Sequence, residues 1–177
     1  MYVYADGSIS AELIEGCQVK AVVGYVEWRT VYAVCLKAKQ LPWSSDWLEV
    51  EAARDMTSGK KATATILAAA KQEGKNAEAA QWCYDYAQDG VIRGEAFLPS
   101  KAELDKIYAN KEAINKSLRA LRASNAIEID GWPRTSSDYN HRAGWEFLMG
   151  EGYRFYCYYY KNHGYYRYVR PVIAFKF

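Results

Sequence analysis

The sequence predicts an α+β fold in which strands from the two ends of the chain share a sheet. Residues 1–36 and 132–177 are rich in β-branched and aromatic residues, whereas residues 63–123 show helical propensity and spacing. Strands, then helices, then strands on one chain are typical of an α+β domain. With 177 residues, half of them hydrophobic, the chain can form one ordinary domain with a sizeable core.

Residues 1–18 contain one clear turn signal. Asp6-Gly7 suits a type I′ turn, and β-branched or aromatic residues lie on both sides of it. We therefore expect a β-hairpin extension over residues 1–18, followed by a larger domain over residues 19–177.

The next two strands are predicted at Val19–Trp28 and Thr30–Leu36, which meet near Arg29. Neither this pair nor Val169–Phe175 can bury both of its faces alone. The sequence thus predicts a mixed or antiparallel sheet that contains strands from both chain ends, with two or more helices packed on it.

Between these strands, the sequence favours a loop and then helices. Trp43 and Trp47 lie in a stretch that we expect to be a loop pinned by both indoles. Ser100 and Glu103 stand at capping-box spacing, which marks a helix start just after Pro99. The other predicted helices are Ile66–Lys71, Asn76–Ala87 and Glu112–Ala123.

Residues 132–177 have the composition of a binding surface. Both histidines lie here, and eight of the 16 tyrosines follow Gly152. A buried core does not favour so many phenols, because each buried hydroxyl needs a hydrogen-bond partner. Tyr mixed with Arg, Asn, His, Ser and Gly is typical of interfaces. The alternative is an exposed, Tyr-rich sheet face that binds nothing.

Charge and hydropathy exclude other classes of partner. Residues 132–177 hold seven Lys/Arg against three Asp/Glu, and the whole chain has a net charge of +2. This bias is milder than the dense basic patch of a nucleic-acid binder, so we expect no nucleic-acid partner. No apolar run is long enough to span a membrane, and the N-terminus lacks a signal-peptide pattern. We expect no membrane insertion and a cytoplasmic or virion-associated protein.

Three segments together resemble a known family. Phe97–Leu104 is similar to its LPS/T-x-x-EL helix start, Trp132–Tyr139 to its W-S-S-S/T-E-Y segment, and Tyr168–Phe175 to its YVRPVxAF terminus. On these motifs, the chain resembles the variable proteins of diversity-generating retroelements. Pro133-Arg134 departs from the pattern, because the family more often has small Ser residues there.

The resemblance implies a C-type lectin fold of the formylglycine-generating-enzyme type. In that family, adenine-directed mutagenesis varies selected C-terminal positions while the scaffold stays constant. The implied function is receptor recognition, as a phage tail-fibre tip or a displayed bacterial protein, with a protein or glycan ligand on a cell surface. It also allows a homo-oligomer, which would be a trimer in a tail fibre.

Strand alternation predicts which residues of this region face the ligand. Phe155 and Cys157 are assigned inward, as are Trp145 and Phe147. The predicted ligand-binding residues are Asn140, His141, Arg142, Glu146, Leu148, Arg154, Tyr156, Tyr158, Tyr160, Asn162, His163, Tyr165, Tyr166 and Arg167. The last five belong to a loop, 162–167, that completes the surface.

Metal and redox sites are not indicated by the sequence. The calcium-binding motifs EPN, QPD and WND do not occur. The four cysteines, which we expect to be isolated buried thiols, form no CxxC pair: they are Cys17, Cys35, Cys83 and Cys157. We therefore predict no metal and no cofactor.

Catalysis by the remaining polar residues is not indicated either. His141 and His163 suit contact residues better than a catalytic pair. Ser136 and Ser137 lack a nucleophile-elbow context and are predicted as strand-end hydrogen-bonding residues. Arg170 is expected to pair with an internal acid or to bond backbone carbonyls.

Two other functions stay open at this point. One is an oxidase-like enzyme of the formylglycine-generating type, against which the missing second nearby cysteine argues. The other is a structural virion or oligomerisation module, with the N-terminal hairpin as the assembly element. Adenine-rich codons beside a near-identical template copy in the genome would separate ligand recognition from both.

Overall fold

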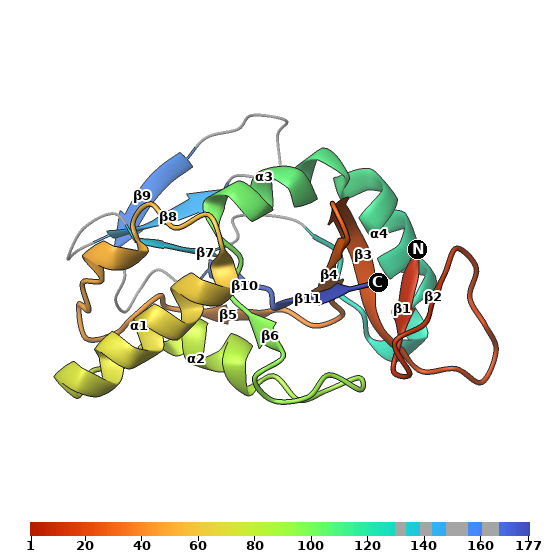
Figure 1. Ribbon diagram of the computed structural model, residues 1–177, viewed down its shortest axis with the longest axis horizontal. Helices are drawn as coiled ribbons and strands as arrows, with labels where there is room; N and C mark the ends of the chain where they lie inside the picture. The colour runs from red at the N-terminus through yellow and green to blue at the C-terminus, as the bar shows by residue number, and fades with distance from the viewer. Residues whose placement is uncertain (130–133, 139–142, 148–155, 161–166) are drawn as a thin grey trace.

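The computed structural model describes residues 1–129, 134–138, 143–147, 156–160 and 167–177, with 143–147 and 156–160 described by their backbone alone. In chain order, the elements are β1 (Tyr2–Tyr4), β2 (Ile9–Ser10), β3 (Val19–Glu27), β4 (Thr30–Cys35), β5 (Lys39–Leu41), the 3₁₀ turn η1 (Glu51–Ala53), α1 (Gly59–Glu73), α2 (Glu78–Asp85), β6 (Ala96–Phe97), α3 (Lys101–Ala109), α4 (Lys111–Ala120), the 3₁₀ turn η2 (Arg122–Ser124), β7 (Arg134–Asp138), β8 (Ala143–Phe147), β9 (Tyr156–Tyr160), β10 (Arg167–Val169) and β11 (Val172–Lys176). In Figure 1, β1–β4 and both termini lie on the right, and β7–β9 lie at the upper left.

The predicted sharing of one sheet by both chain ends is confirmed. Six strands pair in the order β2-β1-β3-β4-β11-β6, each antiparallel to its neighbour. In β11, Ile173 lies opposite both Ala33 of β4 and Ala96 of β6. Val169 belongs instead to β10, which pairs with β5. Pro171, which has no N–H for a ladder, separates the two strands.

The N-terminal hairpin is present, but the predicted type I′ turn is wrong. That turn needs a positive φ at both central residues, whereas Gly7 has a φ of 90° and Asp6 is not among the positive-φ residues. The Asp6 carboxylate instead accepts the Ser8 N–H at 2.9 Å, and the Tyr4 N–H donates to the Ser8 carbonyl across a three-residue loop. β1 pairs with β3 and its Val3 is fully buried, so the hairpin is part of the main sheet. The division of the chain at residue 18 stays a prediction.

α3 and α4 cover one face of this sheet, and the segment around the end of α2 covers the other. On the first face, α3 and α4 bury the predicted apolar positions Leu104, Ile107, Ile114 and Leu118 against β3, β4 and β11. On the second face, Tyr86 and Val91 pack against Val3, Ala33 and Ile173. The six-stranded sheet is therefore buried on both sides over most of its length.

α1 begins at Gly59, earlier than the predicted Ile66, because Ser58 caps it by accepting the Lys61 N–H. It ends at the predicted stop signal, Gly74, which has a φ of 63°. Trp43 is buried beside α1, whereas Trp47 is 38% exposed. Among the described helices, none is both long and apolar enough to cross a bilayer.

Two small sheets complete the fold. β5, which the sequence did not predict, pairs with β10. The second small sheet has the order β7-β8-β9, so β8 is central and β7 and β9 are its two edge strands. α1 and α3 contact β7, which joins this sheet to the helices.

Candidate functional site

β7 is a polar strand that is fully buried. Its five residues, Arg134, Thr135, Ser136, Ser137 and Asp138, are each 0–2% exposed. Buried polar groups destabilise a fold unless they have hydrogen-bond partners. β7 therefore lies in the interior, and none of its five residues is among the predicted ligand-binding residues.

Hydrogen bonds from distant segments hold β7 in place. The bonds are Trp43 Nε1–H to the Thr135 carbonyl at 2.9 Å, the Val50 N–H to the Asp138 carboxylate at 2.6 Å, the Ser136 N–H to the Pro99 carbonyl at 2.8 Å, and the Lys101 N–H to Ser137 Oγ at 3.2 Å. The first two join residues 92 and 88 positions apart, and nothing in the local sequence indicates them. β7 is thus fixed by the helical part of the protein.

The predicted capping box is confirmed, and it also holds a second helix. Ser100 Oγ accepts the Glu103 N–H, and the Glu103 carboxylate accepts the Ser100 N–H at 2.8 Å. The same carboxylate accepts the N–H of Gly59, the first residue of α1, at 3.1 Å. Burial raises the pKa of Glu103 above its usual range, although these N–H groups favour the charged form. The Glu103 side chain therefore caps the N-termini of both α1 and α3.

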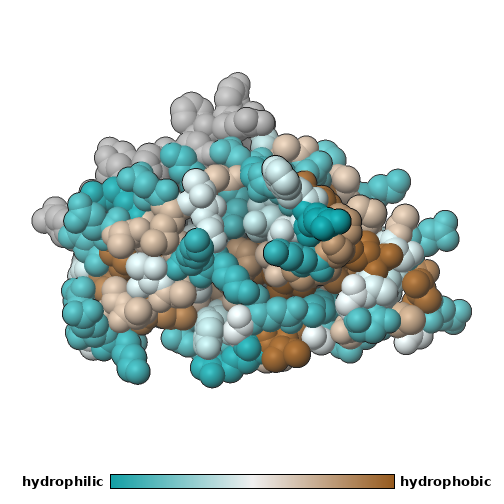
Figure 2. All heavy atoms as spheres, in the orientation of Figure 1, coloured by the Kyte–Doolittle hydropathy of each residue, from teal (hydrophilic) through white to brown (hydrophobic). Residues whose placement is uncertain are grey.

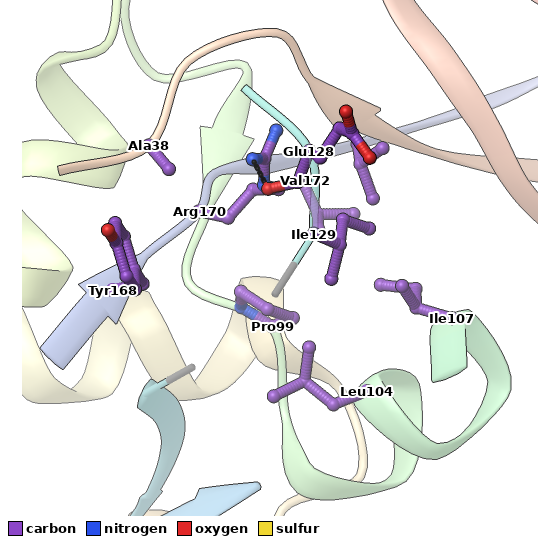
Figure 3. Close-up of a pocket in the computed structure, with 10 residues that line it drawn as sticks. Ala38, Pro99, Leu104, Ile107, Glu128, Ile129, Tyr168, Arg170 and Val172 are labelled. Carbon is purple, nitrogen blue, oxygen red and sulfur yellow. Dashed lines mark hydrogen bonds between the residues drawn. The ribbon is translucent and has the colours of Figure 1, made fainter. Parts of the chain in front are cut away.

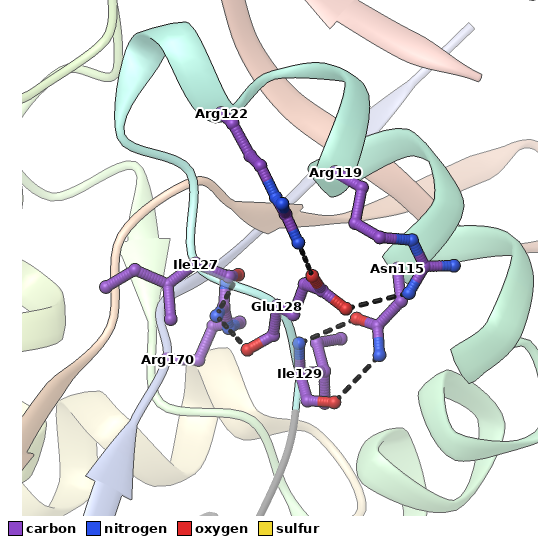
Figure 4. Close-up of polar contacts among 7 residues, drawn as sticks. All are labelled: Asn115, Arg119, Arg122, Ile127, Glu128, Ile129 and Arg170. Atoms are coloured by element: carbon purple, nitrogen blue, oxygen red, sulfur yellow. Dashed lines mark hydrogen bonds and ion pairs between the residues drawn. The ribbon is translucent and has the colours of Figure 1, made fainter.

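Arg170 takes the second of its two predicted roles. Its guanidinium donates to the carbonyl of Cys35 at 2.7 Å. It also donates to the carbonyls of Ile127 at 2.5 Å and Glu128 at 3.1 Å (Figure 4). Burial lowers the pKa of Arg170 to about 10, so the group stays charged at neutral pH. Arg170 thereby joins the end of β4 to the chain that leads towards β7.

Asn115 of α4 supports the same chain. Its side-chain amide donates to the Ile129 carbonyl at 2.9 Å and accepts the Ile129 N–H at 2.7 Å (Figure 4). Asn115 and Ile129 are both 5% exposed. We call β7, Gly59, Ser100, Glu103, Asn115 and Arg170 the frame.

The register of β8 and β9 contradicts the predicted division into inward and outward residues. Trp145 lies opposite Tyr158, and Phe147 lies opposite Tyr156. Residues directly opposite in an antiparallel pair are on the same face of the sheet. Trp145 therefore cannot be on the inner face while Tyr158 is on the outer one. The prediction failed because alternation within one strand leaves its phase relative to the neighbouring strand undefined.

The same register also divides the predicted ligand-binding residues. Glu146 lies opposite Cys157, on the other face from the positions of Tyr156, Tyr158 and Tyr160. Arg167 is in β10 rather than in a loop, and it is half-buried opposite Leu41. The remaining predicted residues lie outside the described part of the chain: Asn140, His141, Arg142, Leu148, Arg154, Asn162, His163, Tyr165 and Tyr166.

The described thiols differ in exposure. Cys35 and Cys83 are free and buried as predicted, and burial raises the pKa of each. Cys17 is exposed, so the expectation of burial is wrong there. The side chain of Cys157 lies outside the described part. Across residues with described side chains, no group of three or more His, Cys, Asp or Glu is placed to hold a metal ion.

A small cavity lies between α3, β11 and the chain before β7. Its walls include Leu104, Ile107, Ile129, Tyr168 and Arg170 (Figure 3). Its volume is about 20 Å³, which is room for about one water molecule. It is a packing defect of the core rather than a ligand site.

Comparison with protein-family models and with curated proteins finds no match. Among solved structures, the chain is similar to a fimbrial protein from Bacteroides ovatus, with a TM-score of 0.66 and 11% sequence identity. The similarity covers 99% of this chain and 48% of that chain, so this chain spans about half the length of the fimbrial protein. At this identity, the comparison shows a shared α+β fold and nothing about activity.

Proposed function

We propose that this protein is a non-enzymatic, hypervariable ligand-binding protein of the kind that diversity-generating retroelements target, built on a C-type lectin fold. Its ligand is a protein or glycan on a cell surface. The binding surface is the face of β8 and β9 that carries Tyr156, Tyr158 and Tyr160, together with the segments that adjoin it.

The contrast between β7 and β9 carries this proposal. β7 is buried and bonded to α3, Trp43 and Val50, whereas β9 is the opposite edge strand of the same sheet. Four of the five β9 residues are tyrosines, which supply large and rigid contact area at an interface. A fixed, buried strand at one edge of a sheet and a Tyr-rich strand at the other edge suit a protein that keeps its fold while its binding residues change.

The segments that resemble the family support the same division. Phe97–Leu104 contributes the Ser100–Glu103 capping box, and Tyr168–Phe175 contributes Arg170. Trp132–Tyr139 contributes β7. All three segments thus supply frame contacts, and the residues between the last two segments supply the proposed binding surface.

Binding arrays test this proposal most simply. The labelled protein is applied to arrays of glycans and of cell-surface proteins, beside a variant with Tyr156, Tyr158 and Tyr160 replaced by Ser. A matched control replaces Tyr84 of α2, which is 37% exposed and outside the proposed surface. We expect a defined ligand for the wild type and the control but not for the triple variant. Equal binding by all three would refute the surface.

A structural module of a surface fibre is the second candidate, because the similar solved structure is a fimbrial protein. In that case the protein would assemble with itself, with the β1–β2 hairpin at the contact. Sedimentation velocity over a range of concentrations distinguishes the two functions. Two results together would favour the structural module. The wild type would self-associate while a hairpin variant does not, and the wild type would bind no glycan or protein on the arrays.

A further inference from the structure

The turn between β3 and β4 exposes a tryptophan in a backbone conformation that disfavours it. Trp28 has a φ of 55° and is 95% exposed. A bulky residue in this left-handed region is strained, and Gly or Asn would fit the turn better. No contact within the described part of the chain compensates for the exposed indole, which points to an interaction outside the chain.

Other apolar and basic side chains gather beside Trp28. The Phe177 N–H donates to the Arg29 carbonyl at 3.2 Å, and Phe177 is 70% exposed. Val26, near the end of β3, is 47% exposed, and Lys176 lies opposite Thr30. In Figure 2, hydrophobic residues lie among hydrophilic ones at the right of the visible face, where β1–β4 and both termini lie. We call Val26–Thr30, Lys176 and Phe177 the tip.

The tip is basic. Arg29 and Lys176 are exposed, and neither has an ion-pair partner among the described residues. Glu27 is the acidic side chain of this group, and its carboxylate pairs with Lys106 at 2.6 Å. The tip therefore presents two cationic side chains, Arg29 and Lys176, beside exposed aromatic rings.

We propose that the tip docks onto an anionic lipid surface. Indole rings favour the boundary between lipid headgroups and acyl chains, and cations beside them are attracted to anionic headgroups. An aromatic anchor at a protein interface usually has a ring of packed neighbours around it, whereas Trp28 stands free on a two-residue turn. A projecting ring of this kind suits a deformable layer better than a rigid partner.

This docking is peripheral: the tip contacts the lipid surface and does not cross the membrane. No described helix spans a bilayer, and the contact is made by one turn and the end of β11. Figure 1 places the C-terminus on the right and β7–β9 on the left, so the tip is separate from that sheet in this view. The inference does not depend on the proposed ligand-binding function.

Vesicle sedimentation tests the proposal, with phosphatidylcholine vesicles that contain or lack phosphatidylserine. We expect binding only to the anionic vesicles, lost at high salt. Trp28→Gly and Arg29→Glu should each weaken binding by roughly tenfold or more. Ile92→Ser removes a 72% exposed apolar side chain outside the tip and serves as the matched control, with binding unchanged.

Thermal unfolding keeps the test independent of folding. Because Gly fits a φ of 55°, Trp28→Gly should leave the melting temperature unchanged or raise it. Trp28→Asn is a second variant with the same expectation. Equal binding to both kinds of vesicle, or no binding to either, would overturn the proposal. So would Trp28-dependent self-association without lipid binding, which would make the tip a contact between copies.

Discussion

Replacing Glu103 with Ala tests the frame at its most connected side chain. The Glu103 carboxylate accepts the Ser100 N–H at 2.8 Å and the Gly59 N–H at 3.1 Å, and the residue is 4% exposed. A hydrogen bond to a charged group contributes about 1.5–3 kcal/mol, and removing the buried charge offsets part of the loss. We expect Glu103→Ala to lower the free energy of unfolding by about 2–4 kcal/mol in urea titrations.

Two further measurements sharpen this prediction. Glu112 also lies in a first helical turn but is exposed, so Glu112→Ala should cost no more than about 0.5 kcal/mol.

The raised pKa of Glu103 means that the folded state binds a proton at this carboxylate more tightly than the unfolded state does. Protonation of Glu103 therefore contributes fully to stability below the pKa that Glu103 has in the unfolded state. This contribution is lost as the pH rises through the pKa that Glu103 has in the folded state. Wild type should therefore gain stability relative to Glu103→Gln on acidification. Equal stability of Glu103→Ala and wild type would refute the double-cap interpretation.

Three further substitutions test the rest of the frame by the same unfolding assay. Gly59→Ala should cost about 1–3 kcal/mol despite the higher helix propensity of Ala, because a Cβ would lie 2.4 Å from the Glu103 carboxylate and 2.6 Å from the Leu98 carbonyl; a stabilised variant would contradict this. Arg170→Lys should cost about 2–4 kcal/mol, because an ammonium group cannot reach all the carbonyls that the guanidinium joins; an unchanged midpoint would show that the bonds are dispensable. Asn115→Ala should cost about 2–3 kcal/mol by leaving both backbone groups of buried Ile129 unpaired, and a loss below about 0.5 kcal/mol would contradict that.

Features set by local chemistry could be predicted from the sequence. The capping box at Ser100 and Glu103, the stop at Gly74 and the strand pair around Arg29 depend on residues close together in the chain. The apolar spacing of Ile114 and Leu118 likewise identified the buried face of α4. Such features need no knowledge of tertiary contacts.

Features that depend on distant partners could not be predicted. β7 is polar in sequence, and its burial depends on hydrogen bonds from Trp43, Val50 and Lys101, which are distant in the chain. Alternation along β8 and along β9 was interpreted separately, so the pairing of Trp145 with Tyr158 could not be foreseen. The type I′ turn failed because the Asp6 carboxylate bonds Ser8 and so favours a different loop.

A stability scan across residues 134–160 tests the central claim, a fixed β7 beside a replaceable face of β8 and β9. Each position is changed to Ala, or to Ser where Ala is native, and the free energy of unfolding is measured. The binding-surface proposal predicts changes within about 0.5 kcal/mol at Tyr156, Tyr158 and Tyr160, and also at Trp145 and Phe147, which share their face.

The reference for a core residue is Val169, which is fully buried and should lose about 1–3 kcal/mol when truncated to Ala. Asp138→Ala should also be destabilising, because it leaves the buried Val50 N–H without its acceptor. If Tyr156→Ala and Tyr158→Ala destabilise the protein as much as Val169→Ala does, these tyrosines belong to the core and the proposed binding surface is wrong.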